Sequence, residues 1–126
     1  MKFFSTNAAP KAIGSYSQAV SDGGFLFASG QVPLDPATGR LVEGDLEVSA
    51  ERVFDNLEAV LREAGLSFRD VVKTTVYLIR AEDFAAMNAV YARRFGEHRP
   101  ARATVIVAAL PAGATLEIDL IARTRG

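Results

Sequence analysis

Apolar residues recur with a helical period in two parts of this chain. From residue 46 to 64 they lie three or four positions apart, on one face of an amphipathic helix: Ala50, Val53, Phe54, Leu57, Val60, Leu61 and Ala64. Gly65 follows as the residue that ends this helix, with Leu66 available for the hydrophobic contact that accompanies such an end. A second helix is predicted to begin near Asp83, since its apolar residues repeat on one side: Phe84, Met87, Tyr91 and Phe95.

Alternating patterns and β-branched residues predict strands elsewhere. The predicted strands span 18–20, 25–29, 71–79, 101–108 and 115–122. The turn that would join the first two strands as a hairpin contains Gly23 and Gly24. Further turns are predicted at 35–39 and 110–113, where a proline precedes a glycine.

Acidic residues alternate with apolar ones in the last predicted strand. Glu117 and Asp119 lie on one face, and the opposite face carries Leu116, Ile118 and Leu120. Two helices and a sheet of about six strands then give an α+β architecture with the helices on one face. The other face is apolar at Val105 and Val107, and exposed patches of more than about a few hundred Å² usually mark an interface. We therefore expect self-association.

Length, charge and residue usage limit the classes of function. The 126 residues suit a single domain spanning 1–126. A net charge of −1 disfavours nucleic-acid binding by bulk charge. The chain has no cysteine and only one histidine, His98, so we expect neither thiolate chemistry nor a metal site. Without a signal peptide or a membrane span among its apolar runs, it is expected to be cytoplasmic.

Arg102 stands near the start of an otherwise apolar strand. A buried guanidinium needs an anionic partner, and its planar fork matches a carboxylate. One interpretation pairs Arg102 with Glu117 or Asp119 within the sheet. The other is that Arg102 holds the carboxylate of a small substrate.

Glu117 allows a similar choice. A single strand glutamate is most often solvated or ion-paired, but in a pocket that also contains Arg102 it would suit a general base positioned over a water. His98, although it is the only histidine, is expected to be a surface or interface residue near a turn.

Four motifs together make the chain resemble the reactive-intermediate deaminase family, also called Rid or YjgF. They are APKAIGSYSQAV at 9–20, ASGQVP at 28–33, PAR at 100–102 and LEI at 116–118. The resemblance covers essentially the whole chain, with the motifs in family order and at family-like spacing. It implies a chorismate-mutase-like α+β subunit, with a mixed six-stranded sheet and two helices on one face, that assembles as a homotrimer with active sites between subunits.

The resemblance also implies roles for individual residues. Arg102 matches the arginine that binds the substrate carboxylate, and Glu117 matches the acid that orients the hydrolytic water. Tyr16, Ser29 and Gly30 match positions that line the same cleft, and Asn88 matches an asparagine of the family's second helix. These four residues and Thr104 are expected to bind the substrate. Neither a metal nor an organic cofactor is implied.

The implied reaction is the hydrolysis of enamines or imines of 2-oxo acids, such as 2-aminoacrylate and 2-aminocrotonate, to the oxo acid and ammonia. The chain departs from the family pattern at Ser15, where a proline is frequent, and at Thr104, where many members have cysteine. The loop around Arg99 also looks shorter than in many relatives, and Arg99 would add a second cation near the pocket. Both differences would change the size of substrate that the pocket accepts.

Two other functions compete with this hypothesis. A non-catalytic trimer that binds small carboxylates or partner proteins would need Arg102 but not Glu117. An RNA-cleaving translation inhibitor, a role attributed to some relatives, fits poorly with the acidic balance and with the lack of an aromatic RNA-binding motif.

Overall fold

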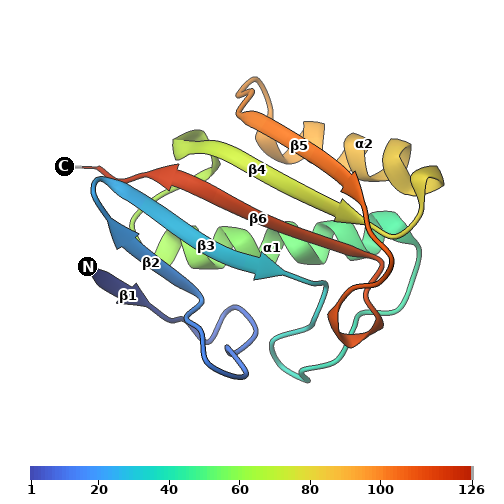
Figure 1. Cartoon of the computed structure of the whole chain (residues 1–126), viewed down its shortest axis with the longest axis horizontal. Helices are drawn as coiled ribbons and strands as arrows, with labels where there is room; N and C mark the ends of the chain where they lie inside the picture. Colours follow the sequence, from blue (N-terminus) through green and yellow to red (C-terminus); the bar gives the residue numbers. More distant parts are fainter. Residues whose placement is uncertain (126) are drawn as a thin grey trace.

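The computed structural model describes residues 1–125 and contains one mixed six-stranded sheet (Figure 1). The strand order is β1-β2-β3-β6-β4-β5, and the strands span Lys2–Phe4, Ala19–Asp22, Phe25–Gln31, Val71–Leu78, Ala101–Ile106 and Leu116–Arg123, for β1 to β6 in turn. Only β4 and β5 run parallel. The expected α+β architecture, with two helices on one face of a mixed sheet, is confirmed, and Figure 1 shows both helices behind the sheet.

Each helix begins and ends where its sequence provides a signal. In α1, Leu46–Glu63, the Asp45 carboxylate caps the N-terminus by accepting a hydrogen bond from the Val48 amide at 3.0 Å. Its end has the predicted glycine: Gly65 has φ of 74°, and the Leu66 amide donates to the carbonyl of Leu61 at 2.8 Å. The second helix, α2, spans Phe84–Phe95, one residue after the predicted start.

The predicted strands were found with small shifts at their ends, but one strand was missed. Residues Lys2–Phe4 form the edge strand β1, paired antiparallel with β2. Three residues are too few to establish a period, and their identity as a strand depends on β2, which lies 15 residues further along the chain. Strand β5 ends at Ile106 instead of 108, where the chain turns away towards a short 3₁₀ turn at Pro111–Gly113.

The core lies between the helices and one face of the sheet. From β6 it receives Leu116, Ile118 and Leu120, as the alternation predicted. Phe54 of α1 is fully buried and makes edge-on contacts at 5.8–5.9 Å with three other rings, those of Phe68, Tyr91 and Phe95. Because residues from α1, α2 and the turn before β4 meet at one ring, this contact determines how the helices lie on the sheet.

The face of the sheet that no helix covers carries exposed apolar side chains. Phe3, Phe25 and Phe27 are 69%, 42% and 46% exposed, and Val105 is 39% exposed. They belong to strands that span both edges and the middle of the sheet, β1, β3 and β5. This distribution agrees with the expected apolar second face, although Val107 itself is half-buried.

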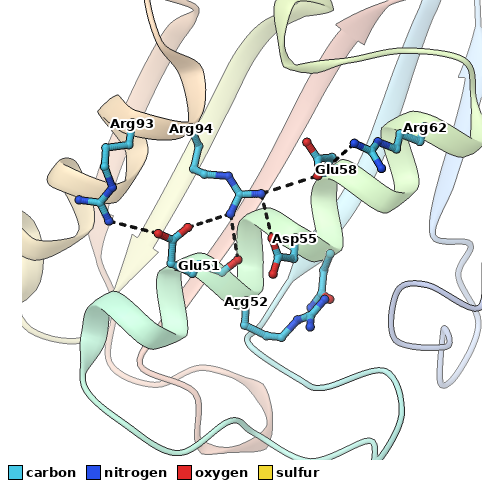
Figure 2. A network of polar contacts seen from close by, with 8 residues as sticks. Glu51, Arg52, Asp55, Glu58, Arg62, Arg93 and Arg94 are labelled. Carbon is cyan, nitrogen blue, oxygen red and sulfur yellow. Dashed lines mark hydrogen bonds and ion pairs between the residues drawn. The ribbon is translucent and has the colours of Figure 1, made fainter.

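Arg94 of α2 joins the two helices on their outer side (Figure 2). Its guanidinium contacts the carboxylates of Glu51 and Asp55 at 2.8 and 2.9 Å, and that of Glu58 at 3.9 Å. The same group lies 5.7 Å from the centre of the Phe54 ring. Arg94 is only 19% exposed, whereas the neighbouring Arg93, which contacts Glu51 alone, is 55% exposed.

Within residues 1–125, no helix is both long and apolar enough to cross a membrane. The same part of the chain has no group of three or more histidine and acidic side chains that would hold a metal ion.

We expect Arg94→Ala to destabilise the fold by about 1–3 kcal/mol, because it removes a largely buried guanidinium that pairs with the carboxylates of both Glu51 and Asp55 and packs against the Phe54 ring. Arg93→Ala is the matched control and should cost about 0–0.5 kcal/mol, since its ion pair is exposed. Urea unfolding at one fixed protein concentration measures both. Equal losses in the two variants would contradict a special role for Arg94.

Candidate active site

Arg102 lies on the edge strand β5 and points towards the helices. It stands opposite Thr74 of β4, whose side chain is buried on that face. Its Nη1 donates a hydrogen bond to Oδ1 of Asn88 at 2.8 Å. Its guanidinium carbon lies 4.6 Å from the centre of the Tyr91 ring and 5.6 Å from that of Phe84. Asn88, Tyr91 and Phe84 all come from α2, so this helix orients the cation.

The aromatic support of Arg102 is itself held in place. The hydroxyl groups of Tyr91 and Thr74 share a hydrogen bond of 2.8 Å in the interior, and burial raises the pKa of Tyr91. Tyr91 therefore stays neutral, and its ring has little freedom to turn away from the guanidinium.

Arg102 makes no ion pair with any carboxylate of residues 1–125. The interpretation that pairs it with Glu117 or Asp119 is therefore wrong within one chain. Those acids stand opposite Tyr77 and Thr75 in β4, on the face of the sheet away from the helices. The Arg102 guanidinium is thus fixed by side chains of α2, and its remaining N–H donors can bind an anion.

A cleft of about 520 Å³ opens beside Arg102. It is lined by Asn88, Tyr91, Ala92, Phe95, His98, Arg99, Pro100 and Arg102. The His98 ring is oriented by a hydrogen bond between its Nε2 and the carbonyl oxygen of Val71 at 2.7 Å. Arg99 is the second cation of this cleft, and its guanidinium donates to the backbone carbonyls of Gly96 and His98. Arg99 is exposed and donates to the backbone, whereas Arg102 is half-buried against the rings of α2.

Glu117 lines a separate cleft of about 510 Å³ on the other side of the sheet. The other lining residues are Ile13, Tyr16, Ser29, Gly30, Val32 and Pro111. Three of the residues that the family resemblance assigned to the substrate cleft therefore line the same cleft as Glu117: Tyr16, Ser29 and Gly30. A fourth, Asn88, lines the cleft of Arg102 instead.

Gly30 is where the backbone of β3 approaches the Glu117 side chain. The pairing of β3 with β6 is irregular between Ala28 and Gln31, and a Cβ atom at position 30 would overlap the Glu117 carboxylate. Only glycine leaves room for the carboxylate to lie against the backbone there.

The electrostatics of Glu117 favour a proton acceptor. Burial, and secondarily the nearby charge of Asp119, raises the pKa of Glu117 above its ordinary value. A carboxylate that is more basic than usual, at the wall of a cleft, suits general base chemistry near neutral pH.

The N-terminal loop that carries Tyr16 is held by a residue that sequence reasoning did not single out. The Gln18 side chain is buried, accepts from the Thr6 amide at 2.8 Å and donates to the Pro10 carbonyl at 2.8 Å. Ser29 adds a hydrogen bond from its hydroxyl to the Ser17 carbonyl at 2.6 Å. The signal available was a buried-strand position occupied by an amide instead of an apolar residue. Tyr16 itself is 54% exposed, and its hydroxyl accepts from the Ile13 amide at 3.3 Å.

Thr104 lies two residues beyond Arg102 on the same side of β5, opposite Val76. Its hydroxyl is buried and has no hydrogen-bond partner among residues 1–125. It is not part of either cleft wall, so its role in substrate binding stays a prediction.

One chain therefore holds two half-sites. Arg102 and Glu117 lie on opposite faces of the sheet, so one subunit alone does not bring them together, and their meeting in a cleft between subunits, as the family resemblance implies, stays a prediction. Each half-site lacks what the other has: an oriented cation in one cleft, and a basic carboxylate in the other.

This chain is similar to a known protein family and to several solved structures. The family described as Endoribonuclease L-PSP matches residues 6–124. The rat 2-iminobutanoate/2-iminopropanoate deaminase is 46% identical over 121 residues, which are 96% of this chain and 88% of the rat protein. A Thermotoga maritima structure described as a putative endoribonuclease is 51% identical, with a TM-score of 0.97 over 100% of this chain and 99% of that one.

Two further solved structures carry names that bear on the family. A protein of the conserved Rid family from Yersinia pestis is 45% identical, with a TM-score of 0.95 and 98% of each chain covered. The Escherichia coli protein TdcF, solved with bound serine, is 41% identical, with a TM-score of 0.94 over 99% of this chain and 100% of that one. With a family match over nearly its whole length and relatives well above 40% identity, this chain belongs to the Rid/YjgF family.

Proposed function

We propose that this chain is a cytoplasmic, cofactor-free deaminase that hydrolyses 2-imino acids and their enamine tautomers to 2-oxo acids and ammonia. One observation carries the proposal: two clefts are lined, one by an oriented arginine that has no carboxylate partner among residues 1–125 and the other by a carboxylate of raised pKa. The deaminase names of the rat and mouse relatives, at 46% and 47% identity, agree with it.

The site is completed by a second copy of the chain in a homotrimer. Arg102 of one subunit would face Glu117 of the next, so that the two half-sites form one cavity. Exposed phenylalanines on the helix-free face supply the apolar surface that such an assembly would bury.

The chemistry follows from the two groups. Arg102 binds the substrate carboxylate through its free donors and holds the C=N carbon in place. An enamine first takes a proton from solvent at its terminal carbon and becomes the protonated imine. Glu117 then accepts a proton from water while the water oxygen bonds to the carbon of the protonated imine and the C=N π electrons move to nitrogen, which gives a neutral carbinolamine.

The second half of the reaction returns the proton. Protonated Glu117 gives its proton to the amine nitrogen, and the C–N bond breaks as the carbinolamine hydroxyl loses its proton to solvent, so that ammonia leaves together with the 2-oxo acid. The protein is restored, and no oxidant or reductant is consumed.

Some relatives are named for RNA cleavage, and this alternative can be tested on the same preparation. RNA cleavage that co-purifies with the protein and disappears in Arg102→Ala would favour it. A threonine dehydratase that supplies the imine, with release of 2-oxobutanoate followed over time, tests the deaminase.

We expect Arg102→Lys to lower kcat/KM about ten- to a hundredfold, a loss of about 1.5–3 kcal/mol, because lysine keeps the charge but loses the fork and its contact with Tyr91. Arg93→Lys, on the outer side of α2, is the control and should retain parent activity. Melting curves recorded beside the kinetics exclude unfolding. A well-folded Arg102→Lys enzyme with the parent rate would refute the carboxylate clamp.

Glu117→Gln should abolish turnover but keep affinity for serine, used as a probe because it carries the carboxylate that Arg102 would bind. A non-catalytic carboxylate sensor would also keep that affinity, but it would show no turnover in the parent protein. Calorimetric titration with serine, beside the coupled assay, separates the two functions.

Glu117→Gln should also raise the melting temperature at pH 7. Since the pKa of Glu117 is raised in the folded state, ionising it destabilises the fold at every pH above that pKa. Below the ordinary pKa of an unfolded glutamate both states are protonated, so the advantage of glutamine should vanish there. A melting difference that does not depend on pH would contradict this origin.

Mixing two inactive variants should restore activity if the sites lie between subunits. When Arg102→Ala and Glu117→Gln chains are refolded together in equal amounts, every mixed trimer contains one site with both native groups. Random assembly then gives about a quarter of the parent activity, because three-quarters of the trimers are mixed and one of their three sites is intact. Light scattering checks the trimer, and a mixture that stays inactive would contradict a shared site.

A further inference from the structure

Asp119 and Tyr77 form a polar pair beside Glu117 that the mechanism above does not use. The Tyr77 hydroxyl donates to Oδ2 of Asp119 at 2.9 Å, between the neighbouring strands β4 and β6. Tyr77 stands directly opposite Glu117 in the register, and Asp119 stands opposite Thr75, one step further along the same face. Glu117 and Asp119 are thus two acids on one strand with a single residue between them.

The hydrogen bond keeps Asp119 in place. Donation from the Tyr77 hydroxyl orients the Asp119 carboxylate towards β4. Both side chains are half-buried. The hydrogen bond to Asp119, followed by burial and the charges of the two acids, raises the pKa of Tyr77, so it remains a donor throughout the physiological range.

Few other charges reach Glu117 from the elements around it. Tyr77 and Asp119 face it from β4 and β6, and Tyr16 is the one titratable group on the remaining wall of its cleft within residues 1–125. The cations of this face, Lys73 and Arg123, lie further along, opposite Ile121 and beside Phe25. Within the subunit, Asp119 is therefore the nearest fixed charge.

We propose that Asp119, oriented by the Tyr77 hydroxyl, is a positioning residue that makes Glu117 a stronger proton acceptor by placing a fixed negative charge beside it. This inference rests on the proposed function. It assigns the pair a role in the proton transfer from water, with Tyr77 acting only through Asp119. A negative charge on the same face favours the protonated form of Glu117, in the direction that its raised pKa already shows.

The tuning can be measured without any turnover. Protein labelled with ¹³C at the glutamate carboxyl carbons is titrated by NMR, and the Glu117 signal is assigned by its loss in Glu117→Gln. We expect the Glu117 midpoint to move to lower pH in Asp119→Asn, and by less in Tyr77→Phe, where Asp119 keeps its charge but loses its donor. Asp22→Asn is the matched control, because Asp22 lies on the same face in β2, with β3 between it and β6.

The catalytic consequence is read from the pH dependence of kcat/KM. The acid limb should move to lower pH in Asp119→Asn, with the rate near neutral pH reduced because the base is weaker, while Asp22→Asn follows the parent. A Glu117 midpoint equal in the parent, Asp119→Asn and Asp22→Asn would overturn the inference. So would a midpoint that moves in Asp119→Asn while the acid limb stays where it is.

The two hypotheses fail in different ways. If the parent protein hydrolyses no imine, the proposed function fails whatever the NMR titration shows. If the parent is active and the Glu117 midpoint does not respond to Asp119, only the inference fails. Where Asp119→Asn folds poorly, as its melting curve would reveal, Tyr77→Phe carries the test, because it retains the aromatic ring and removes only the donor.

Discussion

Side chains alternate between the two faces of a β-strand, and this constraint governs the arrangement of the whole candidate site. In β6 it sends Leu116, Ile118 and Leu120 into the core and Glu117 to the opposite face. In the register of the same sheet it turns Arg102 of β5 towards the helices. The two groups that the proposed chemistry needs are therefore separated by the thickness of the sheet. Assembly of two copies is the arrangement that we propose to unite them.

Each half-site is built from a different kind of support. Arg102 depends on α2, which supplies a hydrogen-bond acceptor in Asn88 and an aromatic surface in Tyr91. Glu117 depends on backbone geometry, because the irregular pairing of β3 and β6 brings Gly30 against its carboxylate. The helix layer also has its own tie, the Arg94 cluster between α1 and α2 (Figure 2). A change in the helix packing would thus disturb the cation more than the carboxylate.

The helix-free face carries two acids, Glu117 and Asp119, close together on β6. A carboxylate beside apolar side chains is already costly to ionise, and a second acid on the same strand increases that cost. Such an arrangement reduces stability and is typical of a functional site, since an ordinary sheet surface would separate like charges. The hydrogen bond from Tyr77 stabilises this arrangement, because it gives the Asp119 carboxylate a donor and leaves its negative charge in place.

The sequence by itself determined most of the local elements and pointed to the residues that we propose carry the chemistry. Its helical and strand periods, the glycine at 65 and the alternation at 116–120 are local signals, and the structure confirms each of them. Four motifs pointed to the family, which the family match confirms, and to Arg102 and Glu117, whose roles stay a proposal.

Only the tertiary structure decided which residues lie together. The insertion of β6 between β3 and β4, the short edge strand β1 and the face on which each side chain lies all depend on pairings between distant segments. No local pattern records those pairings, because a strand has the same period whichever neighbour it pairs with. For this reason only the fold shows that Arg102 and Glu117 lie on opposite faces of one subunit, so that the shared cleft between subunits remains part of the proposal.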